Sequence, residues 1–308
     1  MPTSLTYILF SIIAVIFVFL FAIEKFSRQL ERLAGNRFKS IIQSITSTPL
    51  RGTLIGTVIT AILQSSTATT VIAISLVQGG LMTFRQSLGV IFGANIGTTI
   101  TTQLIAFQLL EVAPFILVLG FLLMKIKTAF GHLGKPIFYF GLMFSTLFII
   151  SVLVEPLKND PWIMGLLTDN ANIYVSLLIG LLITVVLQSS ALISGIMVIL
   201  AGAGLVGFEQ AFAILLGTNV GTTSTALIAA AVMDKEAKRA AMAHFLFNVI
   251  GVVLILPFLK PVSELIMSLS DNSAMQVSLA HILFNVASAI LGLICIKWFE
   301  KLVLRLVR

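Results

Sequence analysis

Charged residues are scarce in this sequence: Asp, Glu, Lys and Arg together make up 10% of its 308 residues. Apolar residues make up 58%, and the mean hydropathy is +1.10. A soluble domain of this length cannot bury so much apolar surface, so water-soluble enzymes and binding modules are excluded. The composition and the long apolar runs indicate an all-α protein that crosses a membrane several times.

Cysteine is nearly absent, and so are the marks of a cleaved leader. The single cysteine, Cys295, cannot form a disulfide within the chain, and we interpret it as a small core residue. The first apolar run, residues 5–23, has no basic residue before it and no small-residue cleavage site after Leu20. It is long enough to cross a bilayer, so we interpret it as a retained membrane span and not as a signal peptide.

What the sequence does contain is a pair of polar motifs, each present twice within long apolar runs. Gln64-Ser65-Ser66-Thr67 returns 124 positions later as Gln188-Ser189-Ser190-Ala191, and Gly93-Ala94-Asn95-Ile96-Gly97-Thr98-Thr99 returns as Gly217-Thr218-Asn219-Val220-Gly221-Thr222-Thr223. The offset holds without a gap over 44 aligned pairs, of which 18 are identical. Most identities fall on polar or small residues, where a purely apolar span gains nothing. A site has been duplicated.

Each copy predicts a re-entrant helical hairpin followed by a broken transmembrane helix. The apolar arms beside each Gln-Ser-Ser motif are too short to cross a bilayer singly. A hairpin with its polar tip deep in the membrane therefore fits better than one span with a glutamine at its centre. The Gly-rich clusters interrupt the span that follows, and the two copies form two repeats.

The predicted organisation has seven crossings and two hairpins. The segments are a first transmembrane helix with a cytoplasmic surface amphipathic helix in 1–52; repeat 1 in 53–154, with hairpin 53–78, broken span 86–110 and spans 112–127 and 136–154; an outer loop in 155–172; repeat 2 in 173–296, with hairpin 173–203, broken span 208–233 and spans 240–259 and 275–296; and a cytoplasmic tail in 297–308.

The positions of the basic residues predict the orientation. With the N-terminus outside, the cytoplasmic segments hold 17 of the 19 Lys and Arg residues, the exceptions being Lys158 and Lys260. The net charge of +7 is therefore an orientation signal and not a footprint for nucleic acid. The first hairpin then enters from the cytoplasm and the second from outside, so the repeats are inverted. We expect a multi-pass protein of the inner or plasma membrane with a cytoplasmic C-terminus.

The hairpin tips have the chemistry of a site for a small oxyanion. If the first hairpin turns at Gln64, then Ser65 or Ser66 caps the returning helix, whose first backbone N–H groups have no helical acceptor. Ser189 and Ser190 repeat this arrangement in the second hairpin. Two facing helix N-termini with serine hydroxyls bind negative charge through their dipoles and N–H groups.

Sodium is expected at the same place, and no cofactor or other metal is expected. Asn95 and Asn219 can cap the second halves of the broken spans, and carbonyls freed at the breaks can coordinate Na⁺ together with side-chain oxygens. No Asp, Glu, Lys or Arg lies in the tips or breaks, which favours Na⁺ over proton coupling and leaves no cation of the protein to neutralise the anion. The residues assigned to sodium are Gln64, Ser65, Asn95, Thr98, Thr99, Gln188, Ser189, Asn219, Thr222 and Thr223.

A second duplicated pattern, His-x-x-Phe-Asn, places His244 and Asn248, and likewise His281 and Asn285, four residues apart on one helix face. We interpret both as scaffold residues that make interhelical hydrogen bonds, and a role in substrate or proton transfer is the alternative. For the Ser-Ser and Gly-Thr-Thr motifs the alternative is helix packing, which is the usual role of small and hydroxyl residues in membrane helices.

At these motifs the sequence resembles the Na⁺/phosphate cotransporter family, the type II renal and intestinal carriers and their bacterial relatives. The resemblance covers residues 50–295 and is carried by the twin Gln-Ser-Ser motifs, the Gly/Asn/Thr clusters and the His-x-x-Phe-Asn segments. It implies that the tips bind phosphate and Na⁺. Family members often have a third serine, where this chain has Thr67 and Ala191, so the second tip has one hydroxyl fewer. The residues expected to bind phosphate are Gln64, Ser65, Ser66, Thr67, Gln188, Ser189 and Ser190.

The leading hypothesis is Na⁺-coupled symport of inorganic phosphate by alternating access to a mid-membrane site. A phosphate exporter, or a carrier of another small oxyanion, is the alternative, because a helix-dipole site distinguishes charge and size more than identity. An intramembrane serine hydrolase using Ser65 or Ser189 with His244 or His281 is disfavoured, since no Gly-x-Ser-x-Gly turn is present. We therefore expect no enzyme, and the sequence leaves the oligomeric state open.

Overall fold

The computed structural model describes residues 5–35, 40–42, 46–127, 129–168 and 172–307, and the regular elements in these ranges are all helices. Six of them are long and apolar enough to cross a membrane. The seventh predicted crossing, 112–127, corresponds to α6 (Leu109–Leu123), whose 15 residues fall short of the roughly 20 that a bilayer requires. The chain is an all-helical, multi-spanning membrane protein.

The helices fall into three groups by length. The long helices are α1 (Leu5–Ala34), α5 (Phe84–Ala106), α7 (Gly134–Val154), α11 (Phe208–Ala230), α12 (Lys235–Ile255) and α14 (Ser273–Ile294). The shorter apolar helices are α3 (Pro49–Leu63), α4 (Ser66–Gln78), α6, α9 (Ile173–Leu187) and α10 (Ser190–Gly202). The remaining elements are α8 (Pro161–Thr168), α13 (Leu259–Leu269), α15 (Ile296–Leu306) and the 3₁₀ turns η1 (Ala129–Leu133), η2 (Glu155–Asn159) and η3 (Leu256–Phe258).

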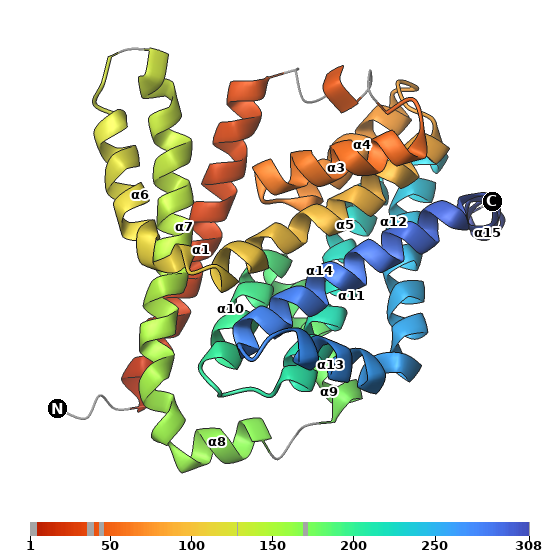
Figure 1. Cartoon of the computed structure of the whole chain (residues 1–308). Coiled ribbons are helices and arrows are strands. Elements are labelled where there is room, and N and C mark those ends of the chain that lie inside the picture. Colours follow the sequence, from red (N-terminus) through yellow and green to blue (C-terminus); the bar gives the residue numbers. More distant parts are fainter. Residues whose placement is uncertain (1–4, 36–39, 43–45, 128, 169–171, 308) are drawn as a thin grey trace.

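The sequence repeat is reproduced in the boundaries of three helices in each copy. Helices α3, α4 and α5 begin and end 124 positions before α9, α10 and α11, respectively. In Figure 1 the chain reaches α3 from the upper end of α1, whereas it reaches α9 from α8 at the lower edge of the molecule. The two helical pairs therefore enter from opposite ends, which is the arrangement expected of inverted repeats.

The prediction of broken spans is wrong, because α5 and α11 run without interruption through both Gly-rich clusters. The glycines serve close packing instead. A Cβ atom on Gly93 would lie 2.0 Å from the carbonyl oxygen of Thr53, and one on Gly217 would lie 2.0 Å from that of Leu177. The Thr57 hydroxyl donates to the carbonyl of Gly93 at 3.2 Å across the same contact. Glycine weakens a helix by only about 1 kcal/mol, and the close approach of α3 to α5 compensates for it.

The first helix is also longer than predicted. α1 continues without a break to Ala34, so residues 24–34 extend the first span and are not a separate surface helix. Residues 36–39 and 43–45 of the predicted amphipathic segment lie outside the described residues. α1 packs along α7, which also packs against α6, and the three helices stand together at one side of the molecule (Figure 1).

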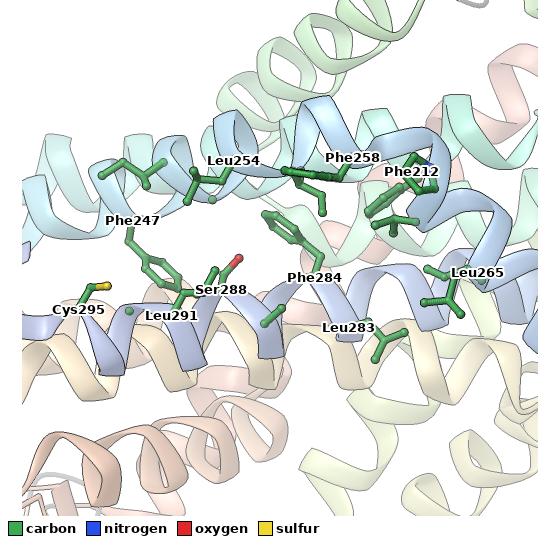
Figure 2. A pocket seen from close by; sticks show the side chains of 18 of the residues that line it. Phe212, Phe247, Leu254, Phe258, Leu265, Leu283, Phe284, Ser288, Leu291 and Cys295 are labelled. Carbon is green, nitrogen blue, oxygen red and sulfur yellow. The ribbon is translucent and has the colours of Figure 1, made fainter.

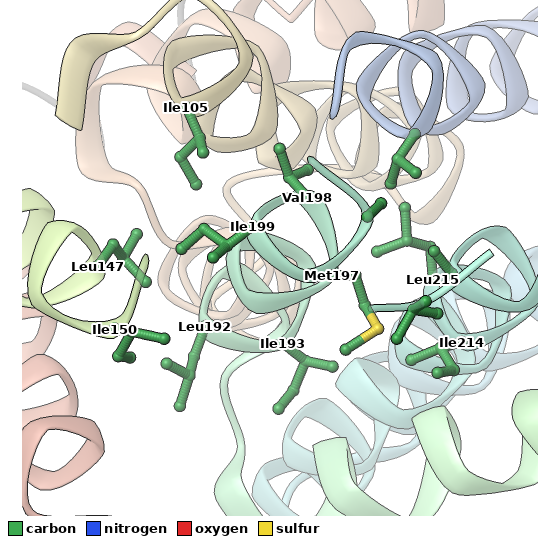
Figure 3. Close-up of a cluster of buried hydrophobic side chains, with 14 of the residues drawn as sticks. Ile105, Leu147, Ile150, Leu192, Ile193, Met197, Val198, Ile199, Ile214 and Leu215 are labelled. Carbon is green, nitrogen blue, oxygen red and sulfur yellow. The ribbon is translucent and has the colours of Figure 1, made fainter. Parts of the chain in front are cut away.

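The largest apolar cluster holds the second hairpin in place. Leu192, Ile193 and Val198 of α10 are buried against side chains from α5, α7 and α11, among them Ile105 and Leu147 (Figure 3). The inner arm of this hairpin thus packs on elements of both repeats. Burial of this kind stabilises by roughly 1.5–3 kcal/mol for each large aliphatic side chain.

Cys295 is exposed, so its interpretation as a core residue is wrong. It follows the last residue of α14 and lies at one end of an apolar cavity of about 870 Å³ between α12, α13 and α14. Phe247, Leu254 and Phe258 line one side of this cavity, and the side chains of α14 line the other (Figure 2).

Candidate functional site

Both Gln-Ser-Ser motifs form the same tight turn between two helices. Gln64 ends α3 in the left-handed region, with φ 54° and ψ 26°, and Gln188 ends α9 with φ 52° and ψ 27°. The next serine is extended and caps the returning helix: the Ser65 hydroxyl accepts the Ala68 N–H at 3.1 Å, and the Ser189 hydroxyl accepts the Leu192 N–H at 3.3 Å. The predicted serine caps are therefore present, at Ser65 and Ser189.

The two turns meet at one cavity of about 500 Å³. All four residues of the first tip, Gln64 to Thr67, and all four of the second, Gln188 to Ala191, line it. Thr98 of α5, Thr225 of α11 and one face of α1 complete the wall. Segments 124 residues apart in sequence thus line a single cavity.

The helix ends make this cavity suitable for an anion. α4 and α10 each start at a tip and have 13 residues, so their first N–H groups and the positive ends of their dipoles lie at the cavity. Ser65 and Ser189 use an oxygen lone pair for the cap, which leaves each hydroxyl proton available to donate. Convergent N–H and O–H donors are the ligands that a phosphate or similar oxyanion needs.

The two tips are not held equally. The Gln64 side chain is 5% exposed, accepts a hydrogen bond from the Thr101 hydroxyl at 2.7 Å and donates to the carbonyl of Ala61 at 2.6 Å. Gln188, its counterpart, is exposed, and the hydroxyl of Thr225, which corresponds to Thr101, is buried without a hydrogen-bond partner. The first tip is therefore hydrogen-bonded to α5 through Thr101, whereas the second tip makes no corresponding bond to Thr225 of α11.

The residues assigned to sodium divide into two groups. Gln64, Ser65, Gln188, Ser189 and Thr98 line the cavity. The others sit in the intact middle of α5 and α11 and do not line it; these are Asn95, Thr99, Asn219, Thr222 and Thr223.

No carbonyls are freed there, because the helices do not break, so the reasoning behind that part of the assignment is wrong. The Asn95 amide donates to the Ile91 carbonyl at 2.9 Å within its own helix, and the Thr222 hydroxyl donates to the Thr218 carbonyl at 2.7 Å. Neither asparagine caps a helix. Thr225 lines the cavity but was not among the predicted site residues. Its position, 124 residues after Thr101, is the sequence signal that could have identified it.

A further correction concerns charge. The motifs predicted no lysine or arginine near the anion, but α1 brings Arg28 into the cavity wall together with Glu24 and Glu31. Arg28 is paired with Glu24 at 2.7 Å. Sequence spacing gave no sign of this contact, since α1 belongs to neither repeat and reaches the cavity only through the tertiary fold.

The two His-x-x-Phe-Asn segments lie in α12 and α14, and all four polar side chains are buried. Asn248 and Asn285 donate to the carbonyls of His244 and His281 within their own helices. Only His281 makes the expected interhelical contact, at 3.3 Å from the Thr102 hydroxyl of α5. Among the described residues neither histidine forms a hydrogen bond with a tip serine, so the hydrogen-bonded nucleophile–base pair of a serine hydrolase is not formed.

Comparison with known proteins identifies the family of the chain. The profile of the Na⁺/Pi-cotransporter family matches residues 18–152 and 162–297. The uncharacterized protein YqeW of Bacillus subtilis is 34% identical over 266 residues, which cover 85% of this chain and 86% of that protein. A Salmonella typhimurium protein named "Putative inorganic phosphate export protein YjbB" is 28% identical over 78% of this chain and 45% of its own length.

The rat protein named sodium-dependent phosphate transport protein 2C is 38% identical over 101 residues, 32% of this chain and 16% of that protein. No solved structure matches the chain significantly. The family match takes in both hairpin tips, both long helices behind them and the part of α1 that lines the cavity. The chain belongs to the Na⁺/Pi-cotransporter family.

Proposed function

We propose that this protein is a secondary transporter that moves inorganic phosphate together with Na⁺ by alternating access. The observation that carries the proposal is the single cavity into which both Gln-Ser-Ser tips project. Phosphate binds there between the N-termini of α4 and α10, with the hydroxyls of Ser65 and Ser189 as donors. Binding between two inverted repeats allows each hairpin to cover the site from its own side of the membrane.

Sodium has oxygen ligands in the same wall. Gln188 and Thr98 line the cavity, and side-chain oxygens of these residue types suit a hard cation. A sodium ion beside the phosphate offsets part of its charge, which a cavity surrounded by apolar helices otherwise disfavours. This mutual stabilisation is the physical basis for coupling the two fluxes.

The direct test is a flux assay with purified protein in proteoliposomes, in which Na⁺ and phosphate are varied independently. We expect phosphate uptake that depends on an inward Na⁺ gradient, and Na⁺ uptake that depends on phosphate. Replacement of Na⁺ by K⁺ should stop phosphate uptake. Phosphate uptake at the same rate in both salts would contradict coupling to sodium.

A second candidate is phosphate export, favoured by the 28% identity to the protein named for phosphate export. The cavity alone does not set the direction of flux, because direction depends on the ion gradients. Proteoliposomes preloaded with phosphate decide between the two. With Na⁺ absent from both sides, an exporter that does not use Na⁺ still releases the preloaded phosphate. A symporter releases phosphate only when Na⁺ is present inside the vesicles.

A further inference from the structure

α1 forms a third wall of the cavity, although it belongs to neither repeat. The residues that it contributes recur every three or four positions and so lie on one helix face: Leu20, Ile23, Glu24, Ser27, Arg28 and Glu31. This face is apolar towards Leu20 and charged towards Glu31. The charged part is the stretch by which α1 exceeds its predicted length.

Arg28 is the one cationic side chain in the described wall of this cavity. Its guanidinium lies 2.7 Å from the Glu24 carboxylate, one helical turn earlier, and the two side chains are 59% and 52% exposed. An ion pair that is exposed to this extent is weak, because water screens both charges. Arg28 can therefore leave Glu24 at little cost when a better anion arrives.

We propose that Arg28 is a phosphate ligand of the cavity, held by Glu24 while the site is empty and transferred to the anion when it binds. The inference rests on the proposed function. A guanidinium binds phosphate oxygens through two parallel N–H donors, and a phosphate that carries more than one negative charge competes well with a single carboxylate. Arg28 then supplies a cationic side chain that neither tip contains, next to the carboxylates of Glu24 and Glu31 in the same wall.

Neighbouring basic residues on α1 do not share this position. Lys25 lies over the ring of Phe21, 5.4 Å from its centroid. Arg32 is exposed in the last turn of the helix and does not line the cavity. Arg32→Gln therefore changes the net charge of the same helix end by the same amount as Arg28→Gln, and it serves as the matched control.

The test measures the initial rate of phosphate uptake into proteoliposomes against phosphate concentration, at a fixed saturating Na⁺ concentration. Arg28→Gln should raise the KM for phosphate about tenfold or more, the effect of losing one charge-assisted contact. Arg32→Gln should leave the KM unchanged, and Glu24→Gln should lower it by removing the competing carboxylate. Arg28→Lys should fall between, because an ammonium cannot make the paired contact.

Two failures are distinguishable. If the unmodified protein shows no Na⁺-dependent phosphate uptake, the proposed function fails. If it does show uptake and Arg28→Gln has the same KM as Arg32→Gln, the function stands and the role of Arg28 is overturned.

A chemical rescue separates charge from folding within one protein sample. Cys295 is the only cysteine, so Arg28→Cys on a Cys295→Ser background carries a unique thiol. Reaction with aminoethyl methanethiosulfonate adds a positive charge at residue 28 and should restore much of the affinity for phosphate. Reaction with methyl methanethiosulfonate, which adds no charge, should not. Equal effects of the two reagents would overturn the inference.

Discussion

Thr101 donates its hydroxyl proton to the side-chain oxygen of Gln64 across 2.7 Å, and this bond joins the first hairpin tip to the long helix behind it. The counterpart residues in the second repeat, Thr225 and Gln188, share the cavity wall without such a bond, because the Thr225 hydroxyl has no partner. Two tips with the same motif are therefore anchored to different degrees. The difference predicts unequal responses to matched substitutions.

Thr101→Val should lower the free energy of unfolding by about 1–3 kcal/mol, because it leaves the buried oxygen of Gln64 without a donor. The measurement is the thermal unfolding of purified protein in detergent. Thr225→Val, the matched control, removes a hydroxyl that has no partner and should change stability by less than about 0.5 kcal/mol. Equal losses in the two variants would contradict the asymmetry.

Ser65→Ala and Ser189→Ala should each weaken phosphate uptake and stability together. Each substitution removes a helix N-cap, worth about 1 kcal/mol, and a hydroxyl donor from the cavity. The measurement is the KM for phosphate in proteoliposomes, which should rise several-fold.

Asp234 caps α12 through a 2.8 Å bond from the Ala237 N–H and lies outside the cavity wall, so Asp234→Ala separates the two effects. This variant should lose similar stability and keep the KM of the unmodified protein. The tips do not bind phosphate if both serine variants also keep that KM.

Gly93→Ala and Gly217→Ala should each lower the unfolding temperature, since the added methyl group meets a backbone carbonyl oxygen at 2.0 Å. Overpacking of this kind costs about 1–3 kcal/mol, whereas alanine would strengthen an isolated helix by about 0.5–1 kcal/mol. Gly207→Ala is the control, because a methyl group there meets nothing within 4 Å. A gain in stability at positions 93 and 217 would favour broken helices over close packing.

The orientation with the C-terminus in the cytoplasm can be tested by labelling. On the Cys295→Ser background, Lys158→Cys should react in intact cells with a maleimide that cannot cross the membrane. Lys238→Cys, exposed at the start of α12, should react only after the cells are permeabilised. The opposite pattern would reverse the orientation predicted from the basic residues.

Much of the site was predictable because it is duplicated. Gln64-Ser65-Ser66 and its copy predicted two equivalent turns. The apolar arms beside each motif are too short to span a bilayer, and they predicted a pair of helices on either side of each turn. The Gly-rich clusters led to the wrong prediction of broken helices, because a glycine in a helical sequence is compatible either with a break or with close packing of two helices. The contact of Gly93 with the Thr53 carbonyl decides between these readings, and it exists only between α3 and α5.

Composition, the repeat and the local capping chemistry specify the membrane class, the two turns and the serine caps, because these depend on short-range spacing and on transfer to lipid. The meeting of the two tips, the intact long helices and the place of Arg28 in the wall depend on contacts between segments distant in sequence. A one-dimensional pattern does not record which faces pack together. Packing in three dimensions alone brings the charged end of α1 to the cavity between the two tips.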